Sequence, residues 1–369
     1  MNKYLRNTLL VIFMAIFVLL VVEGLSRLFF EPIDFLKPKT SYDEVLRYKI
    51  MKNSGAHDSW GYRNKSVPES ADIVAIGDSH TYGISATAAN SWPNALERIS
   101  ERKVYNLSLG GYGPAEYFYL MEEKAFELDP ELIIVGFYLG NDLKDARTAV
   151  YTVPIWEDLR GGSALEEIED RKKTNKEGFS DWLAGNSVLY RIISSSFIGD
   201  NLRQQRRLSK GEEVLMLEDK ESGISTGLTP DRRLKGLDLR SPEVRDGLGL
   251  TFEFFNRMNQ LAQEEEVEFL VVIIPTKETV FSEFILDNDE LANSSTLNRL
   301  LQSEEVVNKL IKAYFTDHNI PYVDMLEPLQ SAAADEQIYP NNFGGHSNKN
   351  GYQLIAESIN KHIESENPN

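Results

Sequence analysis

The chain of 369 residues contains no cysteine. This absence excludes disulfide bonds, thiol nucleophiles and thiolate metal sites, and it suits a compartment in which free thiols are a hazard. Basic residues are also few, with 39 Lys and Arg against 57 Asp and Glu and a formal net charge of -18. Nucleic-acid binding depends on clustered Lys and Arg that neutralise phosphates, and no basic stripe is present, so the composition argues against a nucleic-acid partner. Hydrophobic residues make up 42% of the chain, which is ample for a packed core.

Charged residues are missing from residues 8–22, an apolar run that follows Lys3 and Arg6. Basic residues in front of such a run keep the N-terminus in the cytoplasm, so the rest of the chain is expected on the other side of the membrane. The sequence therefore predicts an extracytoplasmic domain, periplasmic or extracellular, with the membrane as a partner.

The apolar run is shorter than the roughly 20 residues that span a bilayer comfortably, so a cleaved signal peptide is an alternative to an anchor. Gly24 and Ser26 offer a pair of small residues of the kind found at cleavage sites. Apolar residues resume at residues 28–30, however, and extend the helix beyond the charged residues near its end. We therefore interpret residues 1–30 as an uncleaved single-pass anchor.

Five short apolar runs beyond residue 68 predict buried parallel strands separated by helices. The runs are residues 73–76, 104–107, 132–137, 269–274 and 322–323. Strands that alternate with helices in this way predict an α/β fold with a five-stranded parallel sheet. Apolar residues at helical spacing predict a closing helix over residues 352–363.

Two segments do not follow this alternation. Residues 31–68 show no clear period and are interpreted as a linker and irregular lead-in to a domain over residues 69–365. Residues 143–240 are too long for a simple crossover and are interpreted as an inserted cap. Within the cap we predict one amphipathic helix over residues 182–193, a mobile loop over residues 210–227, and solvated charged faces over residues 166–173 and 203–210.

Three of the predicted strands end in polar turns that can meet over one pocket, because ligands bind beyond the carboxyl ends of the strands in an open parallel sheet. The turns are Gly77-Asp78-Ser79, Gly110-Gly111 and Gly140-Asn141-Asp142. The first turn presents a serine, whose hydroxyl is a poor nucleophile unless a base and an oxyanion site accompany it.

The candidates for this base are five histidines: His57, His80, His318, His346 and His362. His80 directly follows Ser79, so its side chain is expected to leave in a different direction. His346 lies in a polar loop just before the final helix and is the preferred base. His57 is kept only as a pocket contact.

Four ordered blocks, formed by Gly77-Asp78-Ser79, Gly111, Gly140-Asn141-Asp142 and His346, resemble the SGNH (GDSL-type) hydrolase family. The second glycine of the Gly-x-Ser-x-Gly elbow is absent, which separates the chain from the α/β-hydrolases. The resemblance extends over nearly the whole extracytoplasmic chain. It implies a flavodoxin-like three-layer sandwich, with residues 69–365 as the SGNH hydrolase domain.

The resemblance implies that Ser79 is the nucleophile, with His346 as its base. It also implies an oxyanion hole made by the amides of Ser79 and Gly111 and by the side chain of Asn141. The implied activity is that of a serine esterase or O-acyltransferase that acts on small acyl groups, acetyl above all, of cell-envelope carbohydrates. No cofactor is implied, and either water or a sugar hydroxyl serves as acceptor.

Other polar residues lie near the same rim. Lys277 follows the fourth predicted strand and, like Asp78 and Asp142, is a candidate for substrate binding; the alternative for Lys277 is a solvated lysine at the start of a loop. Asp142 and Asp145 lack the spacing of a calcium loop, and no paired histidines accompany them, so no metal is expected.

The chain departs from the family pattern before His346, where an aspartate is usual and Phe343 and Gly344 stand instead. A backbone carbonyl, Asn342 or Asp335 are the alternatives for orienting the imidazole, and a serine–histidine dyad is the fallback. Losing an orienting carboxylate can lower turnover severely in a triad enzyme. The alternative function is therefore a catalytically weak glycan-binding or assembly protein of the cell envelope, and a lipase-like enzyme ranks last.

Overall fold

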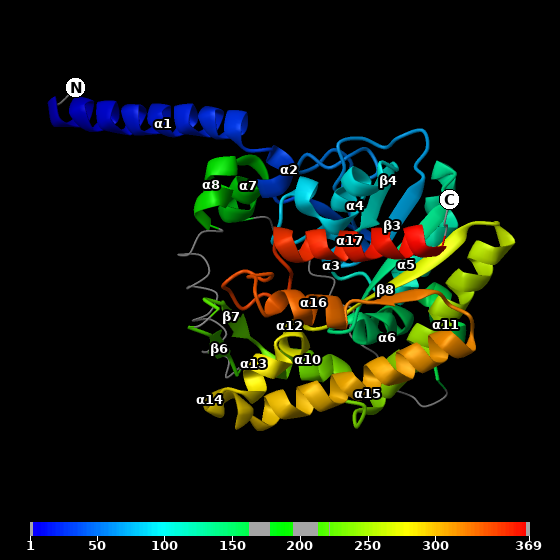
Figure 1. Cartoon of the computed structure of the whole chain (residues 1–369). Coiled ribbons are helices and arrows are strands. Elements are labelled where there is room, and N and C mark those ends of the chain that lie inside the picture. The colour runs from blue at the N-terminus through cyan, green and yellow to red at the C-terminus, as the bar shows by residue number, and fades with distance from the viewer. Residues whose placement is uncertain (1–2, 162–177, 195–212, 221, 367–369) are drawn as a thin grey trace.

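The computed structural model describes residues 3–161, 178–194, 213–220 and 222–366, and a parallel sheet of five strands lies at its centre (Figure 1). In their order across the sheet, the strands are β4 (Val104–Ser108), β3 (Ile73–Gly77), β5 (Leu132–Tyr138), β8 (Glu268–Ile274) and β9 (Tyr322–Asp324). Every residue of β3, β4 and β5 is buried, which accounts for their largely apolar sequences. The five predicted strands are confirmed, and so is the flavodoxin-like order, in which the first strand lies between the second and the third.

Helices cover both faces of the sheet (Figure 1). On one face α4 (Trp92–Ser100) packs against α17 (Lys349–Glu366), which contains the predicted closing helix. On the other face α5 (Pro114–Glu123), α6 (Asp142–Thr152) and α11 (Pro242–Glu264) pack together. The remaining helices of the domain are α3 (Ser79–Tyr82), α10 (Pro230–Leu237), α12 (Lys277–Val280), α13 (Ser282–Leu286), α14 (Asp289–Ala292), α15 (Ser295–Asp317) and α16 (Leu326–Ala333), with 3-10 turns at Ala88–Asn90, Ala125–Leu128 and Pro154–Leu159.

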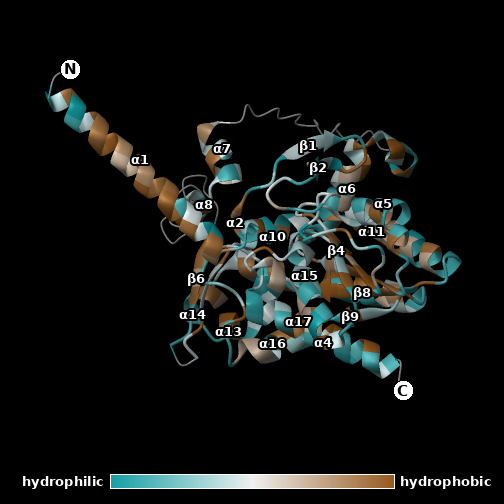
Figure 2. Cartoon of the chain, turned by 90° about the horizontal axis from the view of Figure 1, so that it is seen from above, coloured by the Kyte–Doolittle hydropathy of each residue, from teal (hydrophilic) through white to brown (hydrophobic). Residues whose placement is uncertain are grey.

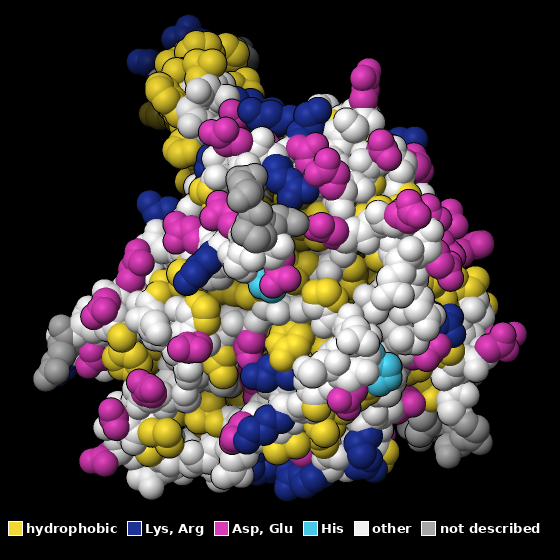
Figure 3. Space-filling view, turned by 45° about the vertical axis from the view of Figure 1, so that its right-hand side comes forward, with side chains coloured by type: hydrophobic (Ala, Val, Ile, Leu, Met, Phe, Trp, Pro, Cys, Tyr) yellow, Lys and Arg dark blue, Asp and Glu magenta, His cyan; other side chains and the backbone are white. Residues whose placement is uncertain are grey.

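The N-terminal helix α1 (Lys3–Phe29) projects from the domain and is apolar along most of its length (Figure 2). Over its most apolar 18 residues the mean hydropathy is 2.8, and none of this window is buried. Figure 3 shows the contrast with the domain, where acidic and basic side chains are interspersed on the visible face while apolar side chains gather on α1. Length and composition suit both a membrane anchor and a signal sequence.

The lead-in over residues 31–68 is more regular than the sequence predicts. It contains the short helix α2 (Pro32–Phe35) and an antiparallel hairpin of β1 (Thr40–Asp43) and β2 (Arg47–Ile50). The carboxylate of Asp43 accepts hydrogen bonds from the turn amides of Val45 and Leu46, at 3.0 and 2.9 Å, and so stabilises the turn of the hairpin. The prediction of a wholly irregular segment is wrong, because strands of four residues are too short to show a period.

The predicted boundaries of the inserted cap are also corrected. α6 lies within residues 143–240 for most of its length but belongs to the sheet layer, where it packs against α11. The predicted single amphipathic helix is two helices, α7 (Phe179–Asn186) and α8 (Val188–Ser194). The chain breaks between them at Ser187, whose hydroxyl accepts a hydrogen bond from the amide of Tyr190 at 3.0 Å and caps α8.

The segment predicted as a mobile loop, residues 210–227, contains most of a second antiparallel hairpin. Its strands are β6 (Leu215–Glu218) and β7 (Ser225–Leu228). The charged runs at residues 166–173 and 203–210 lie outside the described residues.

Candidate active site

A serine and a histidine from opposite ends of the domain sequence meet beyond the carboxyl end of β3. Ser79 begins α3 directly after the strand, and His346 lies in the loop before α17. The Nε2 atom of His346 lies 2.8 Å from the Oγ atom of Ser79. Both residues are half-buried. A nucleophile within hydrogen-bonding distance of a base is the arrangement that acyl transfer requires.

The turn that presents Ser79 depends on Asp78. The carboxylate of Asp78 accepts a hydrogen bond from the amide of His80 at 2.7 Å, which caps α3, and it lies 3.2 Å from the hydroxyl of Ser79. Burial raises the pKa of Asp78 to about 6. Because the side chain is fully buried, Asp78 supports the turn and is not the substrate contact that we predicted.

The turn after β4 lies against the serine. A side chain on Gly110 would place its Cβ 3.3 Å from the Cβ of Ser79. Gly111 has a φ of 86°, a conformation that favours glycine. Among the described residues, neither the amide of Ser79 nor that of Gly111 donates a hydrogen bond, so both are available to a ligand oxygen.

Asn141 precedes α6, and neighbouring carboxylates hold its side-chain amide. The Nδ2 atom donates to Asp145 at 2.5 Å and lies 3.4 Å from a carboxylate oxygen of Asp142. An amide nitrogen carries two protons, and here both face carboxylates, so Asn141 must turn one proton away from Asp142 to bind a ligand oxygen.

Asp142 itself is fully buried beneath this position. It accepts hydrogen bonds from the amide of Tyr138 at 2.9 Å and from the hydroxyl of Tyr117 at 3.1 Å. Burial holds the pKa of Asp142 well above its usual range. Its role is structural, and our prediction that it contacts substrate is wrong.

The hairpin β1–β2 supports the Gly110–Gly111 turn, a contribution that the sequence did not indicate. The hydroxyl of Tyr48 donates to the carbonyl of Gly110 at 2.6 Å, and the guanidinium of Arg47 donates to the carbonyl of Gly111 at 2.8 Å. Arg47 also forms an ion pair with the buried Glu116, at 2.6 Å. These residues therefore fix the backbone beside Ser79.

Lys277 is buried, and it binds the loop that leads to His346. Its ammonium group donates to the carbonyl of Gly344 at 2.7 Å, and to the carbonyl of Asn342 and the hydroxyl of Thr226 at 3.0 Å each. Only 1% of the residue is exposed. Both expectations for Lys277, a substrate contact and a solvated lysine, are therefore wrong.

No carboxylate among the described residues lies within hydrogen-bonding distance of His346. Asn342 uses its side-chain oxygen to accept the amide of Gly344 at 2.7 Å, and Asp335 is exposed on the surface. Neither of these two alternatives for the orienting group is realised. The described part of the chain also contains no hydrogen bond to the Nδ1 atom of His346.

Packing surrounds the imidazole instead. The ring of His80 lies 4.7 Å from the ring of His346 and stacks on Tyr138 at 3.8 Å, measured between ring centroids. His80 is buried, and neither of its ring nitrogens has a hydrogen-bond partner among the described residues. Burial holds the pKa of His80 well below its usual value, so this ring is neutral.

Burial also lowers the pKa of His346, to about 3, and nearby cations add to the shift. In order of effect the cations are Arg233, Arg232 and Lys277. The guanidinium of Arg233 lies so close to Gly345 that any side chain there would collide with it. At neutral pH the imidazole of His346 is therefore neutral and able to accept a proton, but it is a weak base.

The other histidines lie elsewhere. His57 is buried, with Nε2 2.8 Å from the hydroxyl of Tyr82 and Nδ1 3.1 Å from the carbonyl of Gly55, so it stabilises the lead-in and α3 and is not the predicted pocket contact. His318 contacts the carbonyl of Tyr314, and His362 lies on α17. No group of three or more Asp, Glu or His within the described ranges is arranged to hold a metal ion.

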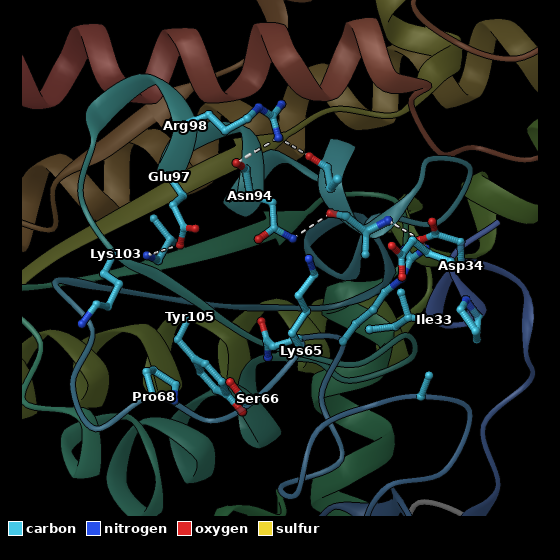
Figure 4. Close-up of a pocket in the computed structure, with 18 residues that line it drawn as sticks. Ile33, Asp34, Lys65, Ser66, Pro68, Asn94, Glu97, Arg98, Lys103 and Tyr105 are labelled. Atoms are coloured by element: carbon cyan, nitrogen blue, oxygen red, sulfur yellow. Dashed lines mark hydrogen bonds and ion pairs between the residues drawn. The ribbon is translucent and has the colours of Figure 1, made fainter. Parts of the chain in front are cut away.

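A separate cavity of about 680 Å³ lies beside α2 and α4 (Figure 4). Three of the polar side chains that line it are bonded within the protein: Asp34 pairs with Arg63 at 3.0 Å, and Arg98 donates to the carbonyl of Asn94 at 3.1 Å. Neither Ser79 nor His346 lines this cavity, so we assign it no part in the chemistry of the serine.

Comparisons with known proteins gave matches only among solved structures, since no family model and no curated protein matches the chain. The chain is similar to an extracellular lipase from Streptomyces rimosus, with 12% identity, a TM-score of 0.42, and 79% of this chain and 99% of that chain covered. It is also similar to a member of the lipolytic protein G-D-S-L family from Veillonella parvula (13% identity, TM-score 0.37, 78% and 96% covered). A third similar structure is an acetyl xylan esterase (10% identity, TM-score 0.38, 79% and 99% covered). Similarities this distant assign neither a substrate nor a reaction to this chain.

The fold and the site nevertheless define a class of protein from the chain's own residues. The chain is an α/β protein of flavodoxin-like topology, with a serine–histidine pair at the carboxyl edge of its parallel sheet. The strand order is the flavodoxin-like one that we expected from the resemblance to SGNH hydrolases, and Ser79 lies beside His346.

Proposed function

We propose that this chain is an SGNH-type serine hydrolase that acts on ester bonds, as an esterase or an O-acyltransferase. The observation that carries the proposal is the distance of 2.8 Å between Nε2 of His346 and Oγ of Ser79. The amides of Ser79 and Gly111 support it, because an ester carbonyl oxygen becomes negative during acyl transfer and needs such donors. We assign Asn141 as the third donor, after its Nδ2 turns from Asp142 toward the ligand.

In the first half of the reaction, Oγ of Ser79 attacks the ester carbonyl carbon while its proton passes to Nε2 of His346. The resulting oxyanion accepts hydrogen bonds from the amides of Ser79 and Gly111 and from Nδ2 of Asn141. The intermediate then collapses, the bond to the leaving alcohol breaks, and the alcohol takes the proton from His346. The product is an acyl ester on Ser79.

In the second half, a hydroxyl from water or from a sugar gives its proton to Nε2 of His346 and attacks the acyl ester. Collapse of the second intermediate returns the proton to Ser79. Water as acceptor makes the chain an esterase, and a sugar hydroxyl makes it an acyltransferase. The proposed substrates are small acyl esters, acetyl above all, of cell-envelope carbohydrates, as the resemblance to the family implies.

We place this chemistry on the outer side of the membrane, with α1 as an uncleaved anchor. Support comes from Glu23, whose carboxylate accepts hydrogen bonds from the hydroxyl of Ser187 at 2.8 Å and from the amides of Val188 and Leu189 at 3.0 and 2.9 Å. Cleavage after Gly24 or Ser26 would remove Glu23, and the first amides of α8 would then lose their hydrogen-bond acceptor.

Labelling with a fluorophosphonate probe tests the proposed reaction, with the full chain in detergent and turnover of a small acetyl ester followed in parallel. We expect Ser79→Ala to lose the label and the turnover, and His346→Ala to lose both as well. His80→Phe is the matched control, because it keeps an aromatic ring against Tyr138 and should keep both signals. Persistent labelling of Ser79→Ala, or equal loss in His80→Phe, would contradict the assigned roles.

A catalytically weak glycan-binding protein is the second candidate. No carboxylate of the described residues lies beside His346, and nearby cations lower the pKa of His346; both observations favour this candidate. It predicts that the wild-type chain binds an acetylated oligosaccharide as tightly as Ser79→Ala does, without labelling or turnover. Serine-dependent turnover would exclude it.

A further inference from the structure

Hydrogen bonds join the C-terminal end of α1 to the domain, and they fix where the domain lies along the helix relative to the membrane. The helical residues 3–22 rise about 30 Å, close to the thickness of a bilayer's hydrocarbon core, provided that Lys3 and Arg6 extend their charged ends to the far headgroups. Glu23 follows immediately and caps the first turn of α8, while the guanidinium of Arg27 donates to the carbonyl of Asn186 at 2.7 Å. If α1 spans the membrane, the junction of α7 and α8 therefore lies where the hydrocarbon core ends.

Large exposed apolar side chains gather at this level. In the part of the chain that the structure describes beyond Arg27, eight large apolar side chains are at least half exposed. Four of the eight lie on the last turn of α1 and on α7: Leu28, Phe29, Phe179 and Trp182. A soluble surface rarely concentrates such side chains without a partner.

The aromatic residues of α7 are arranged as a pair. The rings of Phe179 and Trp182 stack with centroids 5.9 Å apart and an angle of 12° between their planes. They are 76% and 52% exposed. Tryptophan is enriched where a protein meets lipid headgroups, because its ring is apolar while its N–H can stay hydrated.

Figure 1 shows α7 and α8 beside the end of α1, on the side of the domain from which α1 projects, and α8 contacts both α1 and α2. A surface in this place faces the membrane that α1 enters. A helix with aromatic residues exposed at that level has the character of an interfacial helix.

We propose that α7, with the last turn of α1, forms a membrane-contact surface whose partner is the headgroup layer of the lipid bilayer. Phe179 and Trp182 enter this layer. Helix α8 connects α7 to α1, because its first amides donate hydrogen bonds to Glu23. This inference rests on the proposed anchor, but it is independent of the reaction at Ser79. It gives the catalytic domain two points of membrane contact and hence a restricted orientation.

Trp182 allows a direct test on the full chain, because Trp92 and Trp156 are buried. The chain is reconstituted in phosphatidylcholine vesicles with or without lipid that carries a spin label near its headgroup end. We expect the spin-labelled lipid to quench tryptophan fluorescence, with most of this quenching lost in Trp182→Phe and retained in the control Trp60→Phe. Equal quenching of the wild type and Trp182→Phe would refute the surface.

Two further measurements separate the causes of failure. A chain that alkaline carbonate extracts from the vesicles overturns the anchor and the surface together, whereas a retained chain with unquenched Trp182 overturns the surface alone. The chain has no cysteine, so Phe179→Cys supplies a single thiol. Oxidative cross-linking of two chains through this thiol would show that a second copy, and not lipid, covers the surface.

Discussion

The backbone support of Gly111 can be removed without changing the turn itself. Arg47 donates to the carbonyl of Gly111 and pairs with Glu116, and the two charged side chains are only 17% and 1% exposed. Arg47→Met alone leaves Glu116 without its cation, a loss of at most roughly 3–5 kcal/mol for a buried pair. Burial already raises the pKa of Glu116, so proton uptake reduces this loss. The single variant therefore mixes a loss of stability with a loss of support.

The double variant Arg47→Met/Glu116→Gln separates the two effects. Glu116→Gln leaves no unpaired charge, and the new side chain can still accept a hydrogen bond from the amide of Gly113. We therefore expect the double variant to recover most of the unfolding free energy that Arg47→Met loses. The carbonyl of Gly111 still lacks its donor. Losing an oxyanion donor outright costs about 100- to 1,000-fold in kcat, so a displaced amide should cost roughly 10- to 100-fold with little change in KM.

Thermal unfolding and turnover of a small acetyl ester are measured on the same preparations. A double variant with restored stability and wild-type kcat would refute the positioning role of Arg47. Tyr48→Phe serves as the uncharged comparison, since it removes only the 2.6 Å hydrogen bond to the carbonyl of Gly110, worth about 1 kcal/mol. We expect Tyr48→Phe also to lower kcat, as the double variant does.

Three further outcomes are expected. Arg233→Met removes the nearby cation with the largest effect on the pKa of His346, so the acid limb of the kcat/KM profile should move to higher pH, and an unmoved limb would show that Arg233 does not lower this pKa. Lys277→Met removes two hydrogen bonds to the loop before His346 and one to Thr226 on β7, and it should lower the unfolding free energy by about 2–4 kcal/mol in urea denaturation; wild-type stability would contradict this. Burial raises the pKa of Glu304 to about 7, above its unfolded value, so the stability from its protonated form is complete below about pH 4 and is lost as the pH rises to 7. Glu304→Gln should therefore abolish a loss of about 3–4 kcal/mol across that window, and an unchanged slope of unfolding free energy against pH would exclude Glu304 as its source.

The parallel sheet could be predicted because burial leaves a local mark on the sequence. Strands covered on both faces, such as β3 and β5, are continuous apolar runs, and the turns after them carry the polar residues. Ser79 and Asn141 lie within three residues of the ends of such strands, so short motifs sufficed to nominate them. His346 could be nominated because it stands in a polar loop before a helix with a clear apolar period.

The support of the site could not be predicted, because it depends on contacts between distant segments. Tyr48 and Arg47 bind carbonyls 62 and 64 positions away, from a hairpin too short to show a period. Lys277 looks like a loop lysine in the sequence, and its burial depends on carbonyls 65 and 67 positions further along. A backbone carbonyl has no sequence signature, so no local pattern reveals a side chain that binds one.

No carboxylate of the described ranges contacts His346, so two tasks that one aspartate usually performs must be considered separately. An aspartate in a triad orients the imidazole and also stabilises its protonated form. Here the His80–Tyr138 stack and the loop held by Lys277 can limit rotation of the ring, so orientation does not require an acid. Nothing in this packing favours the imidazolium, and Arg233 opposes it. The site thus keeps the geometry of a nucleophile and its base, but the base is weak. A poor leaving group needs the most assistance from the protonated imidazole. The site therefore suits esters with good leaving groups better than amides.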